Sequence, residues 1–278
     1  MLKTRILTSV IILPPIVFAV WYGGAAYILL LVLAGGAIGW EIAHLSDISA
    51  PLPLVAFLAI LAGTPLISEF AGFLPGALWI ATGLLFFGVL AAANLASVPD
   101  RVGLLALCSL SQLALFSLVY LRGIKSGGAE TILFVIAVIA ATDIGGYFAG
   151  KSIGGLRLAP RISPNKTWAG LAGGMVLAGV VGYALAISPI PPFSIGHSEG
   201  APEWSPLTIA LMSVALAPIA QTGDLLESWV KRCRGVKDSG SIVPGHGGIL
   251  DRVDGYLTAA PLVALIALTH EGGPFAWP

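Results

Sequence analysis

Long apolar segments alternate with short polar ones along the whole chain. The apolar runs are continuous and show no alternation with a period of two, which favours helices over the strands of a β-barrel. Each run is long enough to cross about 30 Å of hydrocarbon as a helix. We count nine of them, at 6–22, 24–45, 52–69, 73–95, 102–121, 130–150, 167–188, 206–230 and 254–270. The pattern predicts an all-α, polytopic integral membrane protein with about nine transmembrane helices.

Composition supports a membrane protein. Hydrophobic residues make up 57% of the 278 positions and charged residues 10%, and the mean hydropathy is +0.94, whereas about a quarter of the residues in soluble domains are charged. The formal net charge is zero, so charge alone indicates no partner, and we expect no nucleic-acid ligand. Cys108 is predicted within a span and Cys233 in a polar loop, so we expect no disulfide between them.

The positions of the cations predict the orientation of the spans. If Lys3 and Arg5 are inside, nine spans leave only Arg122 and Lys125 outside, and the cation-free loop 189–205 is external. All remaining cations are then cytoplasmic, as the positive-inside rule requires. We therefore expect a multi-pass protein of a bacterial-type inner (plasma) membrane, with its polar segments facing the cytoplasm.

The polar residues concentrate in the second half of the chain. Residues 1–125 are predicted to be scaffold helices, and residues 126–278 a catalytic half of the same domain, because no linker divides them. Glu41, His44 and Glu69 lie close to predicted helix ends, where we expect interfacial side chains. Three pairs of small residues with the spacing that allows close helix contact are expected to pack within the monomer: Gly35 and Gly39, Gly146 and Gly150, and Gly170 and Gly174.

Residues 145–152 match the G-x4-G-K-S pattern of a nucleotide-binding P-loop. A P-loop follows a buried strand and precedes a helix, whereas here a span-length apolar run precedes the pattern, and Gly154, Gly155 and Pro160 follow it. We therefore expect no P-loop. Thr167 precedes the apolar run at 168 and is predicted to cap that helix.

One carboxylate pair precedes the most polar segment, 228–254, and a second pair lies at its end. Asp224 and Glu227 end the eighth predicted span, and Asp251 and Asp254 begin the ninth. Residues three apart share a helix face, so one loop could bring four carboxylates together, which would require cations to offset their repulsion. Oxygen ligands favour Mg²⁺. Pairing of these acids with Lys231, Arg232 and Arg252 alone is the alternative.

The same segment is typical of a phosphate-binding site. Lys231, Arg232, Lys237 and Arg252 could neutralise a triphosphate, and the glycines of the 244–248 turn could admit a phosphate closely. His246 could donate to phosphate or hold the loop. A second polar cluster is predicted on the same membrane face; it consists of Asp143, Lys151, Arg161, Ser163, Asn165, Lys166 and Thr167.

These residues resemble the phosphatidate cytidylyltransferases, the CDP-diacylglycerol synthases. The segment 228–254 follows the family signature, Ser-x-hydrophobic-Lys-Arg, four residues, Lys-Asp, then Pro-x-His-Gly-Gly-hydrophobic-x-Asp-Arg-hydrophobic-Asp. Val243 stands where a larger aliphatic residue is usual. The segments around Asp143 and Ser163 also resemble this family, so the similarity covers roughly residues 130–270.

The resemblance implies the reaction of CTP with phosphatidate to give CDP-diacylglycerol and diphosphate, for phospholipid biosynthesis, in a homodimer with Mg²⁺ and K⁺ as a second cation. Its implied metal ligands are Asp224, Asp251, Asp254, Asp143 and Glu227. The implied catalytic residues are Asp224, Asp251, Lys231, Arg232, Lys237 and Arg252. The implied substrate-binding residues are Lys151, Ser163, Asn165, Lys166, Thr167, Asp238, His246, Gly247 and Gly248.

Two alternatives remain open at this point. A related membrane transferase, such as a CDP-archaeol synthase or a polyprenol or phytol kinase-like protein, would share the metal and nucleotide chemistry but differ in the lipid or the phosphorus attacked. An ion-coupled transporter would be expected to carry polar or broken segments in both halves, which residues 1–125 lack.

Overall fold

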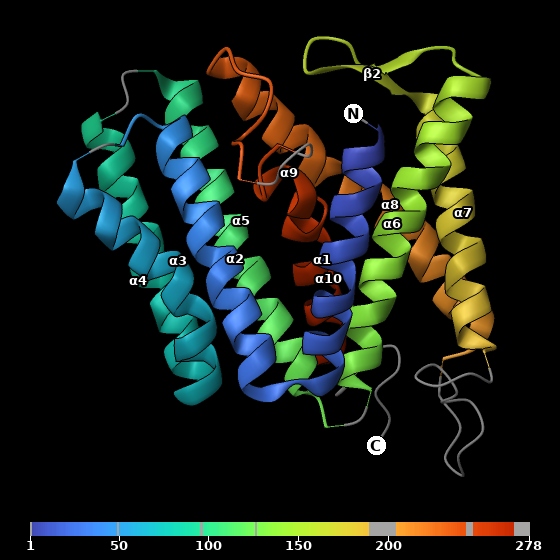
Figure 1. Ribbon diagram of the computed structural model, residues 1–278, viewed down its shortest axis with the longest axis horizontal. Coiled ribbons are helices and arrows are strands. Elements are labelled where there is room, and N and C mark those ends of the chain that lie inside the picture. The colour runs from blue at the N-terminus through green and yellow to red at the C-terminus, as the bar shows by residue number, and fades with distance from the viewer. Residues whose placement is uncertain are drawn as a thin grey trace. The chain divides into compact units, whose positions relative to one another are not determined.

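A computed structural model describes residues 2–48, 50–94, 97–125, 127–188, 204–242 and 247–269. Helices make up most of it (Figure 1). The elements are α1 (Leu2–Tyr22), α2 (Gly24–Leu45), α3 (Pro51–Phe70), α4 (Phe73–Asn94), α5 (Val98–Gly123), α6 (Gly128–Ser152), β1 (Arg157–Ala159), β2 (Ser163–Thr167), α7 (Trp168–Ala186), α8 (Pro206–Cys233), α9 (Leu250–Val253) and α10 (Tyr256–Thr269).

Seven of the described helices, α2 to α8, contain a stretch long and apolar enough to cross a membrane. Two shorter apolar helical stretches, Ile11–Tyr22 and Tyr256–Thr269, coincide with the first and the ninth predicted spans. The helical, multi-pass architecture expected from the apolar runs is therefore confirmed. The count of nine spans stays a prediction, because α10, with 14 residues, is shorter than a full crossing.

A short β-hairpin departs from the all-α prediction. Strands β1 and β2 pair antiparallel between α6 and α7, with Arg157 opposite Thr167 and Ala159 opposite Ser163. Gly154 and Gly155 have φ angles of 66° and 92°, a region that glycine enters without steric cost. They end α6 and turn the chain into β1, so the extended pairing arises in a segment too polar to continue as a membrane helix.

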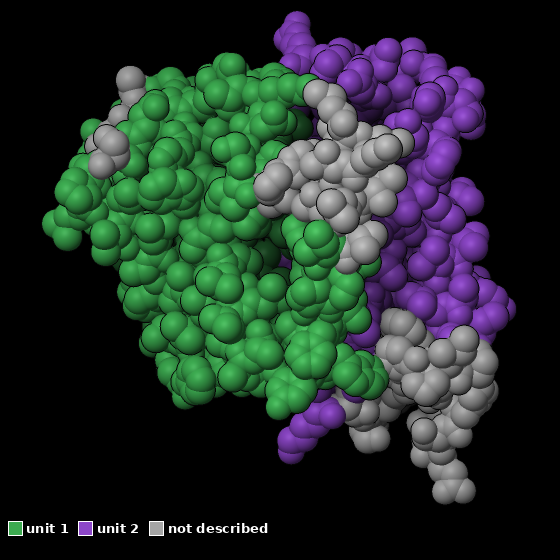
Figure 2. All heavy atoms as spheres, viewed as in Figure 1, with its two compact units in different colours: residues 1–120, 226–257 green, residues 121–225, 258–278 purple. Residues whose placement is uncertain are grey.

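The chain forms two compact units (Figure 2). Unit 1 consists of residues 1–120 and 226–257, and unit 2 of residues 121–225 and 258–278. The segment 226–257 belongs to the same unit as the N-terminal helices, and α8 contributes residues to both units. The division expected at residue 125 stays a prediction.

The core of unit 1 explains why the signature segment belongs there. Phe57 and Phe87 are fully buried with their ring centroids 4.8 Å apart. Val230, Leu250 and Leu257 belong to the same buried apolar cluster. Two stretches of the polar segment are therefore anchored by apolar side chains in the core formed by α2 to α5.

In unit 2, glycines allow α6 and α7 to pack closely. A Cβ atom at Gly145 would lie 2.5 Å from the backbone oxygen of Gly173, and one at Gly170 would lie 2.9 Å from that of Gly146. Residues 145–152 lie within α6, so the expectation that they form no P-loop is confirmed. In α2, a Cβ atom at Gly35 would lie 2.7 Å from the Leu61 oxygen. All three small-residue pairs therefore serve packing within one chain.

We expect Gly145→Ala to destabilise the protein, because the added methyl group overlaps the Gly173 oxygen. Overpacking of this kind costs about 1–3 kcal/mol. Gly88→Ala is the matched control, since a Cβ atom there has no neighbour within 4 Å. It should be neutral or stabilise the helix by up to about 1 kcal/mol. Thermal unfolding in detergent measures both variants, and equal midpoints would contradict the packing assigned to Gly145.

Candidate functional site

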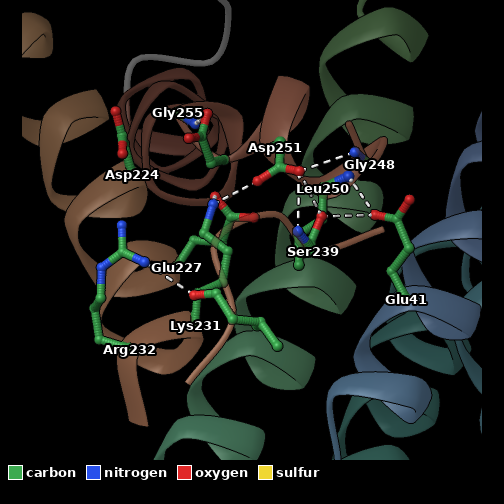
Figure 3. A network of polar contacts seen from close by, with 12 residues as sticks. Glu41, Asp224, Glu227, Lys231, Arg232, Ser239, Gly248, Leu250, Asp251 and Gly255 are labelled. Carbon is green, nitrogen blue, oxygen red and sulfur yellow. Dashed lines mark hydrogen bonds and ion pairs between the residues drawn. The ribbon is translucent and has the colours of Figure 1, made fainter. Parts of the chain in front are cut away.

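Asp251 organises the polar loop of unit 1. Its Oδ2 atom accepts hydrogen bonds from the Ser239 backbone N–H at 3.0 Å, the Ser239 hydroxyl at 3.0 Å and the Gly248 N–H at 2.8 Å. Figure 3 shows these three donors converging on one carboxylate oxygen. Gly247 has a φ angle of 84°, and a Cβ atom there would lie 2.9 Å from the same oxygen. The loop is therefore closed around this carboxylate.

Lys231 is held between two carboxylates. Its Nζ atom lies 3.0 Å from Glu227 Oε2 and forms an ion pair with Asp251 Oδ1. The Glu227 and Lys231 residues are only 1% and 7% exposed, so water screens these charges weakly. Glu227 Oε1 is buried without a hydrogen-bond partner among the described residues.

Asp251 stays ionised because of this environment. Burial alone raises the pKa of a carboxyl group. Here the hydrogen bond from Lys231, together with those from Gly248 and Ser239, outweighs burial and holds the pKa of Asp251 below its usual value. The interactions of the ionised carboxylate therefore stabilise the folded protein at neutral and mildly acidic pH. That contribution is lost as the pH falls through the lowered pKa.

The other cations of the segment differ in their availability. Lys237 and Arg252 are exposed, and Arg232 is exposed while it donates to the Val236 oxygen at 2.9 Å. Arg234 is engaged elsewhere, since it binds the Leu45 carbonyl, the Asp47 carboxylate at 3.0 Å and that of Asp100 at 3.6 Å. Lys237 and Arg252 can therefore contact an anionic ligand, whereas Arg234 joins helix ends.

In unit 2 an ion pair joins strand β2 to α8. Lys166 forms an ion pair with Asp224 Oδ2, which also accepts from Gln221 at 3.4 Å. Thr167 Oγ1 accepts a hydrogen bond from the Gly170 N–H at 3.0 Å, so the predicted helix cap is confirmed. The exposed Lys151 lies over the Tyr147 ring, 5.6 Å from its centroid.

The predicted site residues are divided between the two units. Unit 2 contains Asp143, Lys151, Ser163, Asn165, Lys166, Thr167 and Asp224. Unit 1 contains Glu227, Lys231, Arg232, Lys237, Asp238, Gly247, Gly248, Asp251, Arg252 and Asp254. His246 lies outside the described residues. Among the residues that the structure describes, no three His, Cys, Asp or Glu side chains form a group that could hold a metal ion on their own.

Glu41 contacts the loop around Asp251, although its sequence position does not indicate a site residue. The prediction that it is interfacial is wrong, since the residue is 1% exposed and its carboxylate accepts hydrogen bonds from Ser239, Ile249 and Leu250. His44, three residues later, is exposed, and so is Glu69, and their interfacial placement stays a prediction. The available signal was a charged residue three positions before His44, within an otherwise apolar helix. Only contacts distant in sequence distinguish it from an interfacial side chain.

Comparison with known proteins shows the family. The sequence model of the Cytidylyltransferase family matches residues 3–270. The phosphatidate cytidylyltransferase of Brucella suis biovar 1 is 35% identical over 287 residues, which cover 95% of this chain and 92% of the relative. The Bacillus subtilis protein of the same name is 34% identical, with 96% and 98% coverage. That of Rickettsia bellii is 42% identical over 135 residues, with 49% and 56% coverage.

The family match includes both the N-terminal helices that carry Glu41 and the loop around Asp251. Two of the relatives also extend over nearly their whole length and that of this chain. The chain therefore belongs to the Cytidylyltransferase family.

Proposed function

We propose that this protein is a phosphatidate cytidylyltransferase, which converts CTP and phosphatidate to CDP-diacylglycerol and diphosphate. The observation that carries the proposal is the buried Glu227–Lys231–Asp251 set, with Lys237 and Arg252 exposed in the same unit. The names of the relatives that align over at least 92% of their length support the same activity. The apolar helices supply the membrane setting in which a lipid phosphate meets a water-soluble nucleotide.

The proposed reaction exchanges one phosphoanhydride bond for another. A phosphatidate oxygen attacks the α-phosphorus of CTP and forms the new P–O bond, while the bond from that phosphorus to the β-phosphate oxygen breaks and diphosphate leaves. An ionised phosphate is already a nucleophile, so no dedicated general base is required. Arg232, Lys237 and Arg252 would bind phosphate oxygens and offset the charge of the leaving diphosphate.

The carboxylate oxygens of unit 1 are ligands of the kind that Mg²⁺ prefers. Glu227 Oε1 is a buried oxygen without a hydrogen-bond partner in the described part of the chain, and Asp251 Oδ1 pairs with the Lys231 ammonium. Magnesium in phosphoryl-transfer sites is commonly held by one or two carboxylates together with substrate phosphates and water. Glu227 and Asp251 would hold such an ion, which would supply charge stabilisation at the phosphates.

The remaining assignments belong to the same proposal. Asp143, Asp224 and Asp254 stay predicted metal ligands, and K⁺ stays the predicted second cation. We also propose a homodimer with nine spans in a bacterial inner membrane, its phosphate-binding segment facing the cytoplasm. The positive-inside distribution of cations supports this orientation.

Labelled nucleotide tests the reaction directly. Purified protein with Mg²⁺, phosphatidate and α-labelled CTP should transfer the label into the lipid phase, because the α-phosphorus stays with the nucleotide that joins the lipid. With γ-labelled CTP the label should remain in water as diphosphate. Transfer of γ-label into lipid would instead identify a kinase. An α-label that remains wholly aqueous would overturn the proposal.

Asp251→Asn should abolish most activity, since it removes a charge that pairs with Lys231 while keeping the size of the side chain. We expect kcat to fall by about 10²–10³-fold, the range for the loss of one preorganised electrostatic group. Asp47→Asn is the matched control, because the Asp47 side chain is 87% exposed and surface ion pairs contribute little to stability. Near-normal turnover of Asp251→Asn, or an equal loss in both variants, would refute the role of Asp251.

The orientation is tested with the native thiols. Cys233 is exposed and Cys108 buried, so a membrane-impermeant maleimide should label Cys233 from the cytoplasmic side only. A Cys233→Ser/Lys125→Cys variant moves the reactive thiol to the α5–α6 connection, where labelling should occur from the external side only. Labelling of both proteins from the same side would contradict the proposed topology.

A further inference from the structure

We propose that Glu41 is a positioning residue for the reaction, which holds the loop around Asp251 in its active geometry. This inference rests on the proposed function for its kinetic consequence and on the contacts within unit 1 for its structural one. Glu41 lies on α2, about two hundred residues before the loop that it contacts. Glu41 acts through Asp251. Its hydrogen-bond partners in the loop are Ser239, Ile249 and Leu250, none of which is assigned to bind substrate.

The Glu41 carboxylate accepts from consecutive residues of the loop. Oε1 binds the Ile249 N–H at 2.8 Å, and Oε2 binds the Leu250 N–H at 2.8 Å. Oε2 also lies 3.1 Å from the Ser239 hydroxyl. Figure 3 shows the Glu41 side chain directed at this part of the loop from a helix of its own. Within the described part of the chain, both oxygens therefore have their hydrogen-bond partners in this loop.

Ser239 connects Glu41 to Asp251. Its hydroxyl oxygen lies 3.1 Å from Glu41 Oε2 and 3.0 Å from Asp251 Oδ2, and its backbone N–H also donates to Asp251. A hydroxyl group has one hydrogen to donate, so the two carboxylates share this donor. A displacement of Glu41 is therefore transmitted to the carboxylate that pairs with Lys231.

Two glycines of the loop are required by this side chain. A Cβ atom at Gly240 would lie 2.7 Å from Glu41 Oε1, and its three nearest atoms all belong to Glu41. A Cβ atom at Gly248 would lie 2.6 Å from Glu41 Oε2 and 2.1 Å from the Ser239 hydroxyl oxygen. The backbone thus approaches the carboxylate closely on two sides, which is possible only without side chains there.

An acid in this environment is costly unless it is fully hydrogen-bonded. Glu41 is 1% exposed, and no lysine or arginine of the described part of the chain forms an ion pair with it. Its carboxylate is stabilised by N–H and O–H donors alone, and charge-assisted hydrogen bonds of this type are about twice as strong as neutral ones. The free-energy cost of burying the Glu41 carboxylate is thus offset by hydrogen bonds that also order the loop.

Glu41→Gln tests the proposal. The variant keeps the shape but turns one acceptor into an N–H₂ donor, which must face a loop donor. We expect kcat for cytidylyl transfer to fall by about 10–100-fold per folded enzyme, as for other residues that orient a reacting group, with KM for CTP changed less than threefold. Glu69→Gln, at an exposed acid on α3, is the matched control and should retain full activity.

Hydrogen exchange supplies a readout that does not depend on activity. In the wild-type protein the amides of Ile249 and Leu250 should be protected, and in Glu41→Gln they should exchange at least about tenfold faster, because ΔG of local opening falls by the lost hydrogen bonds. Peptides from α6 and α7 should exchange at the same rate in the wild-type protein and in Glu41→Gln. Unchanged exchange at 249–250 would overturn the proposal even if wild-type protein showed no cytidylyl transfer.

A double-mutant cycle separates positioning from general destabilisation. Gly240→Ala should lower kcat about tenfold or more in the Glu41 background, because its methyl group displaces the loop from the carboxylate, but at most about twofold in Glu41→Ala, where the overlap is gone. Additive losses, or a loss in Glu41→Gln explained entirely by a smaller folded fraction, would show a structural role only. If the wild-type protein transfers no cytidylyl group, the proposed function fails. Hydrogen exchange alone then tests whether Glu41 holds the loop.

Discussion

The burial of Lys231 between Glu227 and Asp251 is the interaction on which the local structure depends. Ionised groups removed from water are tolerated only when each is paired or hydrogen-bonded. Asp251 meets this requirement with an ion pair on one oxygen and three protein donors on the other. Each of those donors comes from the loop that precedes α9, so the loop conformation and the ionisation of Asp251 depend on one another.

The glycines of the segment follow from this arrangement. A carboxylate can be reached by several backbone N–H groups only if the chain passes close to it, and a side chain on Gly240, Gly247 or Gly248 would occupy that space. The glycines of this segment therefore serve the internal anchoring of the loop.

The helices provide anchoring of a different kind. In lipid there is little hydrophobic drive between helices, so close packing through small residues becomes important. The contacts of Gly145 and Gly170 in unit 2 and of Gly35 in unit 1 are of this type. Val230, Leu250 and Leu257 extend the apolar core of unit 1 to both ends of the polar segment. The charged residues are therefore held in place by an apolar core.

Much of this organisation could be predicted from the sequence. Long apolar runs predict membrane helices because a helix satisfies its own backbone hydrogen bonds, and the predicted ranges 24–45 and 73–95 agree closely with α2 and α4. The carboxylates and cations of 228–254 were recognisable by their spacing and by their contrast with the surrounding apolar sequence. Thr167 was predictable as a cap because capping is a local interaction between residues three apart.

The sequence by itself determined the helical membrane class, the segment that carries the chemistry and, through its signature, the resemblance to a family. It did not determine the β1–β2 hairpin, whose pairing depends on backbone register rather than on composition. Nor did it show that Lys231 is held internally, that Asp224 pairs with Lys166, or that Glu41 contacts the loop at 249–250. Only the tertiary structure decided these pairings, because hydrogen bonds and ion pairs act over a few ångströms and folding brings together residues far apart in the chain.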